Sequence, residues 1–113
     1  MFEKLRKCFK RKLQRSLDKK DINGNELEKM LKEGAILVDV RSPQEYKEGH
    51  LEGAISIPEY EIISKHSSSF SSRDETIILY CSNGLRSKKA QRKLEKIGYN
   101  NIYNLKLGDK FFL

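Results

Sequence analysis

The chain has 113 residues, of which 37% are hydrophobic and 35% charged, a composition typical of one soluble globular domain. No apolar stretch reaches the ~20 residues that a spanning helix needs, and the charged N-terminus lacks the apolar segment of a secretory signal. We therefore expect a cytoplasmic protein. The two cysteines, Cys8 and Cys81, form no Cys-x-x-Cys pair or Cys/His cluster, which argues against a disulfide framework and a structural metal.

The formal net charge of +7 is concentrated in the first 20 residues, which hold nine basic and two acidic side chains. Residues 21–113 hold 14 of each sign, so their composition does not indicate a nucleic-acid partner. Apolar residues recur in the leader at helical steps of three and four: Phe2, Leu5, Phe9, Leu13 and Leu17. We predict an amphipathic leader helix over residues 1–20 and one domain over residues 21–113.

The sequence leaves three roles open for the leader. It fits a helix that is solvated or packed on the domain, a helix that lies on an anionic membrane surface or docks a partner, or a transit peptide. Peripheral membrane association is therefore an alternative to a purely cytoplasmic location. Cys8, beside the apolar stripe, is interpreted as a packing residue, with lipidation or a resolving thiol as the alternatives.

Helices and strands alternate along the rest of the chain. Helices are predicted over residues 23–34, within 42–50, from 58 and over 86–97, and strands over 35–39, 54–57, 76–80 and 101–105. Residues 64–73 contain six serines and are interpreted as a surface loop in which His66 is solvated. The alternation predicts βαβ units, a parallel sheet and right-handed crossovers.

The candidate site is the segment from Cys81 to Arg86, between a predicted strand and a predicted helix. Open α/β sheets place ligands at the carboxyl ends of their parallel strands, where this segment falls. Backbone N–H groups of the loop and of the helix start can converge on the sulfur. Gly84 permits a positive φ and Arg86 adds a positive charge, so we expect Cys81 to be a thiolate near neutral pH.

Two motifs in this chain resemble those of single-domain rhodaneses. One is Cys81-Ser-Asn-Gly-Leu-Arg-Ser87 after the strand Ile-Ile-Leu-Tyr, and the other is Val38-Asp-Val-Arg-Ser-Pro-Gln-Glu-Tyr-Lys-Glu-Gly-His-Leu-Glu-Gly-Ala-Ile-Ser-Ile-Pro58. The resemblance covers roughly residues 21 to 107. It implies a three-layer α/β sandwich with a central parallel sheet of about five short strands flanked by helices, to which the leader helix is added.

The resemblance also implies sulfur transfer through a persulfide on Cys81, without cofactor or metal. A small donor such as thiosulfate, a polysulfide or a persulfide would load Cys81, and a thiol, cyanide or a protein acceptor would unload it. Arg86 is predicted to steer an anionic donor and balance the persulfide charge. The loop residues expected to bind through their backbone are Ser82, Asn83, Gly84 and Leu85.

Four further polar residues are interpreted as structural support, because buried charges are usually paired: Asp39, Arg41, Glu45 and His50. His50 is not predicted to be a catalytic base. Two other functions share this pattern, a cysteine-dependent phosphatase or arsenate reductase and a non-catalytic binding module of the same fold. Cysteine phosphatases place five residues between cysteine and arginine, whereas four separate Cys81 from Arg86, which favours sulfur over phosphate.

Overall fold

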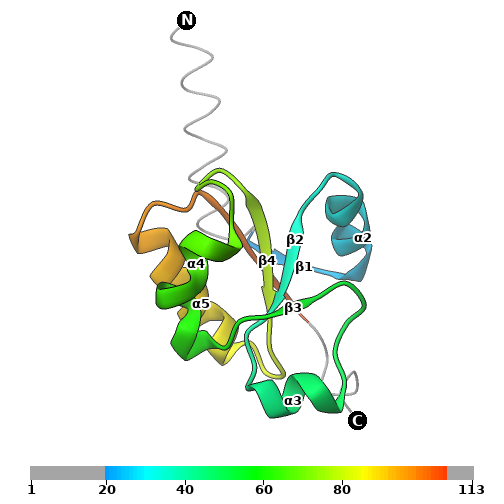
Figure 1. The fold of residues 1–113 in the computed structure, drawn as a ribbon. Coiled ribbons are helices and arrows are strands. Elements are labelled where there is room, and N and C mark those ends of the chain that lie inside the picture. Colours follow the sequence, from blue (N-terminus) through cyan, green and yellow to red (C-terminus); the bar gives the residue numbers. More distant parts are fainter. Residues whose placement is uncertain (1–19, 107–113) are drawn as a thin grey trace, which may run out of the picture.

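The computed structural model describes residues 20–106 and shows a five-stranded parallel sheet with helices on both faces (Figure 1). The strands are β1 (Asp21–Ile22), β2 (Ile36–Asp39), β3 (Ile55–Ser56), β4 (Thr76–Tyr80) and β5 (Asn101–Leu105), in the spatial order β1-β5-β4-β2-β3. The helices are α2 (Gly24–Lys32), α3 (Pro43–Glu48), α4 (Ile62–Ser69) and α5 (Leu85–Lys96), with a 3-10 turn, η2 (Glu59–Glu61). The predicted parallel α/β sandwich is therefore confirmed.

The central strands β2 and β4 are buried on both faces, as their continuous apolar sequences predict. Alternate side chains of β4 enter two cores, because successive residues of a strand point to opposite faces. Ile77 and Leu79 pack in the core that also contains residues of α4 and α5, whereas Ile78 and Tyr80 pack on the side of α2. Burial of each such side chain contributes about 1.5–3 kcal/mol, which anchors β4 in the middle of the molecule.

The carboxyl ends of β2, β3 and β4 meet at one edge of the sheet, the lower edge in Figure 1. Each strand there leads into a helical segment: α3, η2 and α5 respectively. Backbone hydrogen bonds tie the three exits together, since Val40 N donates to Tyr80 O at 3.1 Å and Glu59 N donates to Val40 O at 2.9 Å. The edge that the sequence predicted to carry the site is thus a junction of three loops.

The two helices α2 and α3 begin with capping boxes that are visible in the sequence. Asn23 caps α2 and Ser42 caps α3, and in each case the third helical residue is a glutamate whose carboxylate accepts from the cap's backbone N–H: Glu26 and Glu45. Such reciprocal bonds satisfy N–H groups that a helix start otherwise leaves unpaired. In α3 the cap also fixes the position of Glu45, the residue that pairs with Arg86.

The prediction of a loop over residues 64–73 is wrong for residues 64–69, because α4 runs to Ser69, and holds for residues 70–73. The helix is anchored by Ile62, which is completely buried, and is followed by buried Phe70. Its serines are compatible with the helix, because their hydroxyls bond to backbone carbonyls one turn earlier. Ser64 Oγ donates to Glu61 O, and Ser68 Oγ donates to Lys65 O. Tertiary burial therefore outweighs the low helix propensity of serine.

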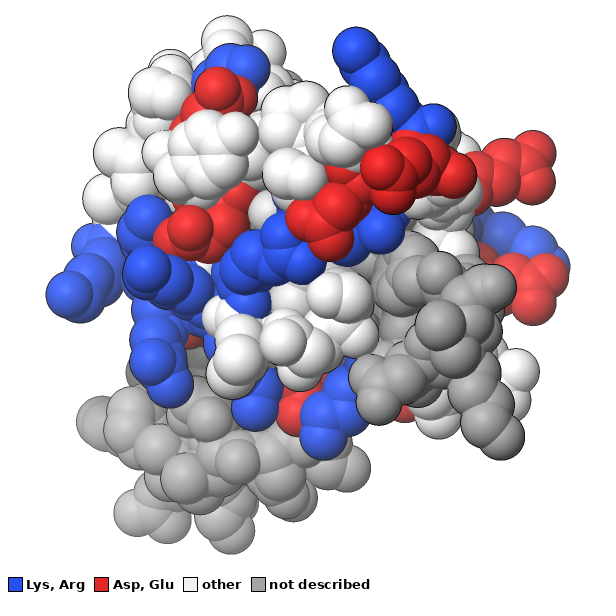
Figure 2. All heavy atoms as spheres, turned by 90° about the horizontal axis from the view of Figure 1, so that it is seen from below, with Lys and Arg blue, Asp and Glu red and all other residues white. Residues whose placement is uncertain are grey.

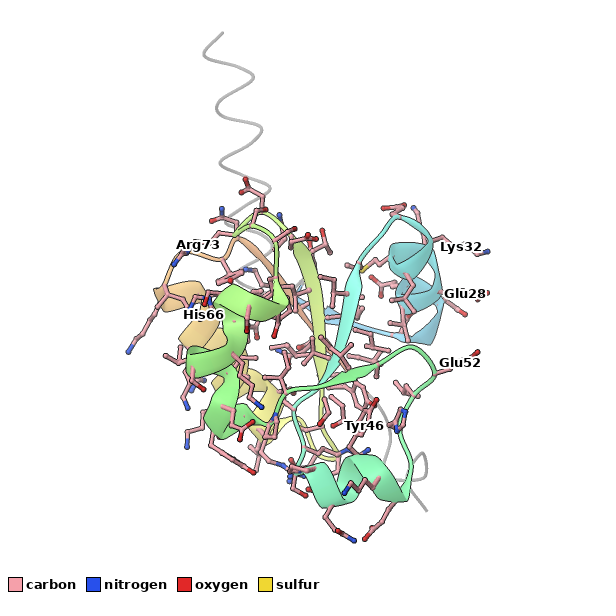
Figure 3. All side chains as sticks on the ribbon, viewed as in Figure 1. Glu28, Lys32, Tyr46, Glu52, His66 and Arg73 are labelled. Carbon is pink, nitrogen blue, oxygen red and sulfur yellow. The ribbon has the colours of Figure 1, made fainter. Side chains whose placement is uncertain are left out.

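The prediction that His66 is solvated is also wrong. His66 lies half-buried on α4, and its Nδ1 is 2.8 Å from the hydroxyl of Tyr99, whose ring it meets edge to face. Arg73, labelled with His66 in Figure 3, places its guanidinium 5.7 Å from the centre of the same ring. His66 thus joins α4 to the segment between α5 and β5.

Strand β1 was not predicted, because two residues carry no periodic pattern. It is defined by backbone bonds to β5, in which Lys106 N donates to Ile22 O at 3.0 Å. The predicted leader helix, apart from Lys20, lies outside the described residues, as does Cys8. Within residues 20–106, no helix is both long and apolar enough to cross a membrane.

Candidate active site

Cys81 lies at the carboxyl end of β4, in the loop that leads into α5. Its side chain is buried, with 2% of the residue exposed. The loop turns sharply at Gly84, the cap residue of α5, which adopts a left-handed conformation with φ +84°. Residues other than glycine rarely adopt this conformation, so Gly84 allows the chain to fold back over the cysteine before the helix begins.

The sulfur of Cys81 accepts two backbone hydrogen bonds from this turn. Gly84 N lies 3.1 Å from Sγ and Ser87 N lies 3.3 Å from it. Both N–H groups belong to the start of α5, where the helix has no internal acceptors for them. Their dipoles point at the sulfur and stabilise negative charge on it, as at other anion sites at helix starts.

Ser87 is a site residue that the sequence analysis did not single out. Its side chain is completely buried, with Oγ 3.5 Å from Cys81 Sγ and donating to Gly84 O at 3.2 Å. Ser87 is the third residue of α5, and helices leave the N–H of that position unpaired. This position relative to Gly84 is the signal that could have identified it.

The remaining loop residues contribute mainly to the shape of the loop. Asn83 Oδ1 accepts from Leu85 N at 3.1 Å and lies 3.9 Å from Cys81 Sγ. Ser82 contributes its hydroxyl, which accepts from Arg86 Nη2 at 3.2 Å. Of the four residues predicted to bind through their backbone, Gly84 alone donates its N–H to the sulfur.

Arg86 forms a two-bond ion pair with Glu45 of α3. Its Nη1 lies 2.5 Å from Glu45 Oε1 and its Nη2 lies 3.0 Å from Oε2. The hydrogen bonds from Arg86 are the largest influence on Glu45 and lower its pKa from 4.5 to about 2. The pair places a positive charge beside the cysteine loop, but a carboxylate largely compensates that charge.

Asp39, Arg41 and Tyr80 form a buried network beneath this edge. Arg41 Nη2 donates to Asp39 Oδ2 at 2.7 Å and to Gly49 O at 2.6 Å, and the Tyr80 hydroxyl donates to Asp39 Oδ2 at 2.9 Å. Burial is the main reason that the pKa of Tyr80 rises above its ordinary value. The same hydroxyl accepts from Leu51 N, so the network holds the segment after α3 against the sheet.

His50 lies on the surface of that segment and has no described contact with Cys81. Its ring stacks on Tyr46 with 3.7 Å between ring centres, and its Nδ1 is 2.8 Å from Tyr46 O. It is exposed, unlike Asp39 and Arg41, which are buried. Across the described range, 20–106, no group of three or more His, Cys, Asp or Glu residues could hold a metal ion.

The sequence profile of the rhodanese-like domain matches residues 23–110. The chain belongs to the rhodanese-like family. Among its relatives, thiosulfate sulfurtransferase PspE of Escherichia coli is 33% identical over 67 residues, and YqhL of Bacillus subtilis is 42% identical over 76 residues. The matches cover 59% and 67% of this chain, and 64% and 59% of PspE and YqhL respectively, so this chain spans less than two thirds of each relative.

Another relative has a different activity in its name. The tRNA uridine(34) hydroxylase of Buchnera aphidicola is 37% identical over 101 residues, a match that covers 81% of this chain and 30% of the hydroxylase. Solved structures agree on the fold of this rhodanese-like chain. The human single-domain sulfurtransferase TSTD1 superposes with a TM-score of 0.66 at 26% identity, covering 76% of this chain and 88% of TSTD1.

Proposed function

We propose that this protein is a sulfurtransferase that carries sulfane sulfur as a persulfide on Cys81. The observation that supports the proposal most directly is the pair of N–H groups, from Gly84 and Ser87, that point at Sγ from 3.1 and 3.3 Å. Donors arranged before the reaction stabilise an anion without reorganisation. The activity in the name of PspE is consistent with this chemistry.

The reaction divides into two displacements at sulfur. The Cys81 thiolate attacks the outer sulfur of a donor such as thiosulfate; the S–S bond of the donor breaks, and its electron pair leaves on sulfite. Cys81 then holds the transferred sulfur as a persulfide. Cyanide or a thiolate attacks that outer sulfur, the Cys81 S–S bond breaks, and its electron pair returns to Sγ.

The network of Asp39, Arg41 and Tyr80 has a positioning role in this proposal. It fixes the ends of β2 and β4, which carry α3 and the cysteine loop. Arg86 and Glu45 then join these two segments directly. Neither the phosphatase nor the binding-module alternative is favoured by the comparisons, and the four residues between Cys81 and Arg86 remain an argument against a phosphate-sized ring.

The test is the intact mass of the protein after brief incubation with thiosulfate or with polysulfide. We expect a gain of one sulfur atom that dithiothreitol reverses and that Cys81→Ser lacks. Cys8→Ser is the matched control and should still gain the sulfur. No gain from either donor, in a folded protein whose Cys81 reacts with an alkylating agent, would refute the proposal and redirect the search to phosphate esters and binding partners.

A further inference from the structure

The solvent-facing side of α5 carries a line of unpaired basic residues that begins at the cysteine loop. Spacings of three and four residues place these side chains on one helical face. These four basic residues are Lys88, Lys89, Arg92 and Lys96. Together with Leu85, at the end nearest the loop, they form what we name the α5 stripe, and all five are exposed. From Leu85 to Lys96 a helix extends about 16 Å, so the stripe leads from the site across this side of the molecule.

The stripe holds the unbalanced charge of the helix. Among the charged residues of α5, Arg86 pairs with Glu45, Lys93 with Glu59, and Glu95 with Lys20. The four basic residues of the stripe have no ion-pair partner among residues 20–106. Figure 2, which views the carboxyl ends of the strands, shows Lys and Arg side chains gathered at the left, the side on which α4 and α5 lie in Figure 1.

This arrangement is unfavourable for the helix itself. Lys88 and Lys89 lie near the N-terminal end of α5, where the helix dipole favours acidic side chains, and the first turn contains none. Lys88 and Arg92, and Arg92 and Lys96, are like charges four residues apart, which repel. When a sequence departs from the local preferences of a helix and gains no structural contact by it, the departure often marks a functional site. Lys96 in the last turn suits the helix dipole, but the stability of α5 does not explain Lys88, Lys89 and Arg92.

Leu85 indicates what kind of partner the stripe suits. It is 71% exposed although it is apolar, and it stands at the end of the stripe nearest Cys81. An apolar contact beside basic residues fits a protein surface. Proteins that bind single-stranded nucleic acid commonly stack bases on aromatic side chains, and the stripe has none.

We propose that the α5 stripe docks an acidic segment of a partner protein, with an apolar side chain against Leu85, so that the partner's cysteine reaches Cys81. This inference rests on the proposed sulfur transfer and names its protein acceptor by chemistry. The partner thiolate bonds to the outer sulfur of the Cys81 persulfide as the Cys81 S–S bond breaks. The electron pair of that bond stays on Sγ, and the proton of the persulfide moves with the transferred sulfur.

The experiment uses residues 1–113 with Cys8→Ser, so that Cys81 is the single cysteine. The protein is loaded with polysulfide, freed of excess donor and mixed with one of three peptides. Each peptide has one cysteine, one leucine and a run of glutamates, glutamines or lysines. The rate of sulfur gain by the peptide is read by mass, at ionic strengths from about 0.02 M to about 0.5 M.

We expect the acidic peptide to react about tenfold faster than the neutral one at low salt, and the lysine peptide to react more slowly than both. Lys88→Glu/Arg92→Glu should remove the preference. Lys88→Glu places an acidic group where the helix dipole favours it, and Arg92→Glu stands four residues before Lys96, an attractive pair that offsets the repulsion between positions 88 and 92. The control Lys29→Glu/Lys32→Glu makes the same change of net charge on exposed residues of α2 and should retain the preference.

Comparing each variant with the wild type cancels differences in peptide thiol reactivity. Equal rates for the three peptides, or a preference that Lys88→Glu/Arg92→Glu retains, would overturn the proposal. So would an RNA oligomer that inhibits transfer at lower concentration than a cysteine-free acidic peptide does.

A second readout separates this proposal from the sulfur transfer itself. The peptides are supplied as mixed disulfides with thionitrobenzoate, and the Cys81 thiolate displaces that coloured leaving group without any persulfide. An acidic preference in this exchange supports the docking surface even if Cys81 never accepts sulfur, and its absence refutes the docking surface even if Cys81 does.

Discussion

The ion pair between Glu45 and Arg86 predicts how the stability of the protein depends on pH. Hydrogen bonds from Arg86 lower the pKa of Glu45 from 4.5 to about 2 in the folded state. Because the folded pKa is the lower one, the pair's contribution is complete above about pH 4.5 and is lost as the pH falls toward about 2. Glu45→Gln, which keeps the size of the side chain, removes that contribution at every pH.

The size of the effect follows from the geometry and exposure of the pair. For a fully sheltered group, the change in pKa would correspond to about 3 kcal/mol of unfolding free energy. The side chains of Arg86 and Glu45 are 36% and 34% exposed, and solvent screening reduces the contribution to about 1 kcal/mol. We therefore expect Glu45→Gln to lower the free energy of unfolding by about 1 kcal/mol near pH 7, and by progressively less below pH 4.5.

Urea unfolding at about pH 7, 4.5 and 3 measures this difference directly. Glu48→Gln is the matched control, since Glu48 lies in the same helix and is exposed, and its described side-chain partner is Gln44 rather than an arginine. The control should change stability by less than about 0.5 kcal/mol at each pH. A Glu45→Gln effect that stays constant from pH 7 to pH 3, or that Glu48→Gln reproduces, would refute the reasoning.

Three further substitutions test the loop and its support. Gly84→Ala introduces a Cβ into open space, so only the left-handed backbone destabilises the variant, by about 1–2 kcal/mol in urea unfolding. The rate of persulfide loading should fall because the N–H of residue 84 shifts away from Cys81 Sγ, and an unchanged rate would contradict this. Ser87→Ala keeps the backbone N–H that donates to Cys81 Sγ, so it should slow persulfide loading less than tenfold when loading is quenched at set times and measured by mass. A complete loss of loading would assign a catalytic role to the hydroxyl. Asp39→Asn removes the carboxylate that pairs with buried Arg41 and should lower the free energy of unfolding by about 3 kcal/mol in urea. A loss below about 1 kcal/mol would contradict a strong buried pair.

Most of the fold could be predicted because local sequence and tertiary position agree in most elements. Thr76–Tyr80 is an apolar, branched run because it lies in the centre of a sheet covered on both sides. The serine-rich helix could not be predicted because its anchors, Ile62 and Phe70, stand at its two ends and its interior has no strong apolar face. Strand β1 is too short to show a period at all.

Some residues of the candidate site could likewise be predicted from the sequence, and others could not. Cys81 and Gly84 are neighbours in sequence, and a cysteine followed by a glycine turn at a strand end is visible without a structure. The pairing of Arg86 with Glu45 crosses 41 positions of the chain, so no local pattern shows that the steering arginine is compensated. The burial of Ser87 likewise depends on how α5 packs on the sheet.

The cap of α3 has a consequence for the register of α5. Glu45 is held by Ser42 at the start of its own helix, so it offers a fixed anchor to Arg86, the second residue of α5. A helix turns about 100° per residue, so one residue inserted between Leu85 and Arg86 would rotate the arginine away from that anchor. The pair between Glu45 and Arg86 therefore couples the register of α5 after the cysteine loop to the position of α3.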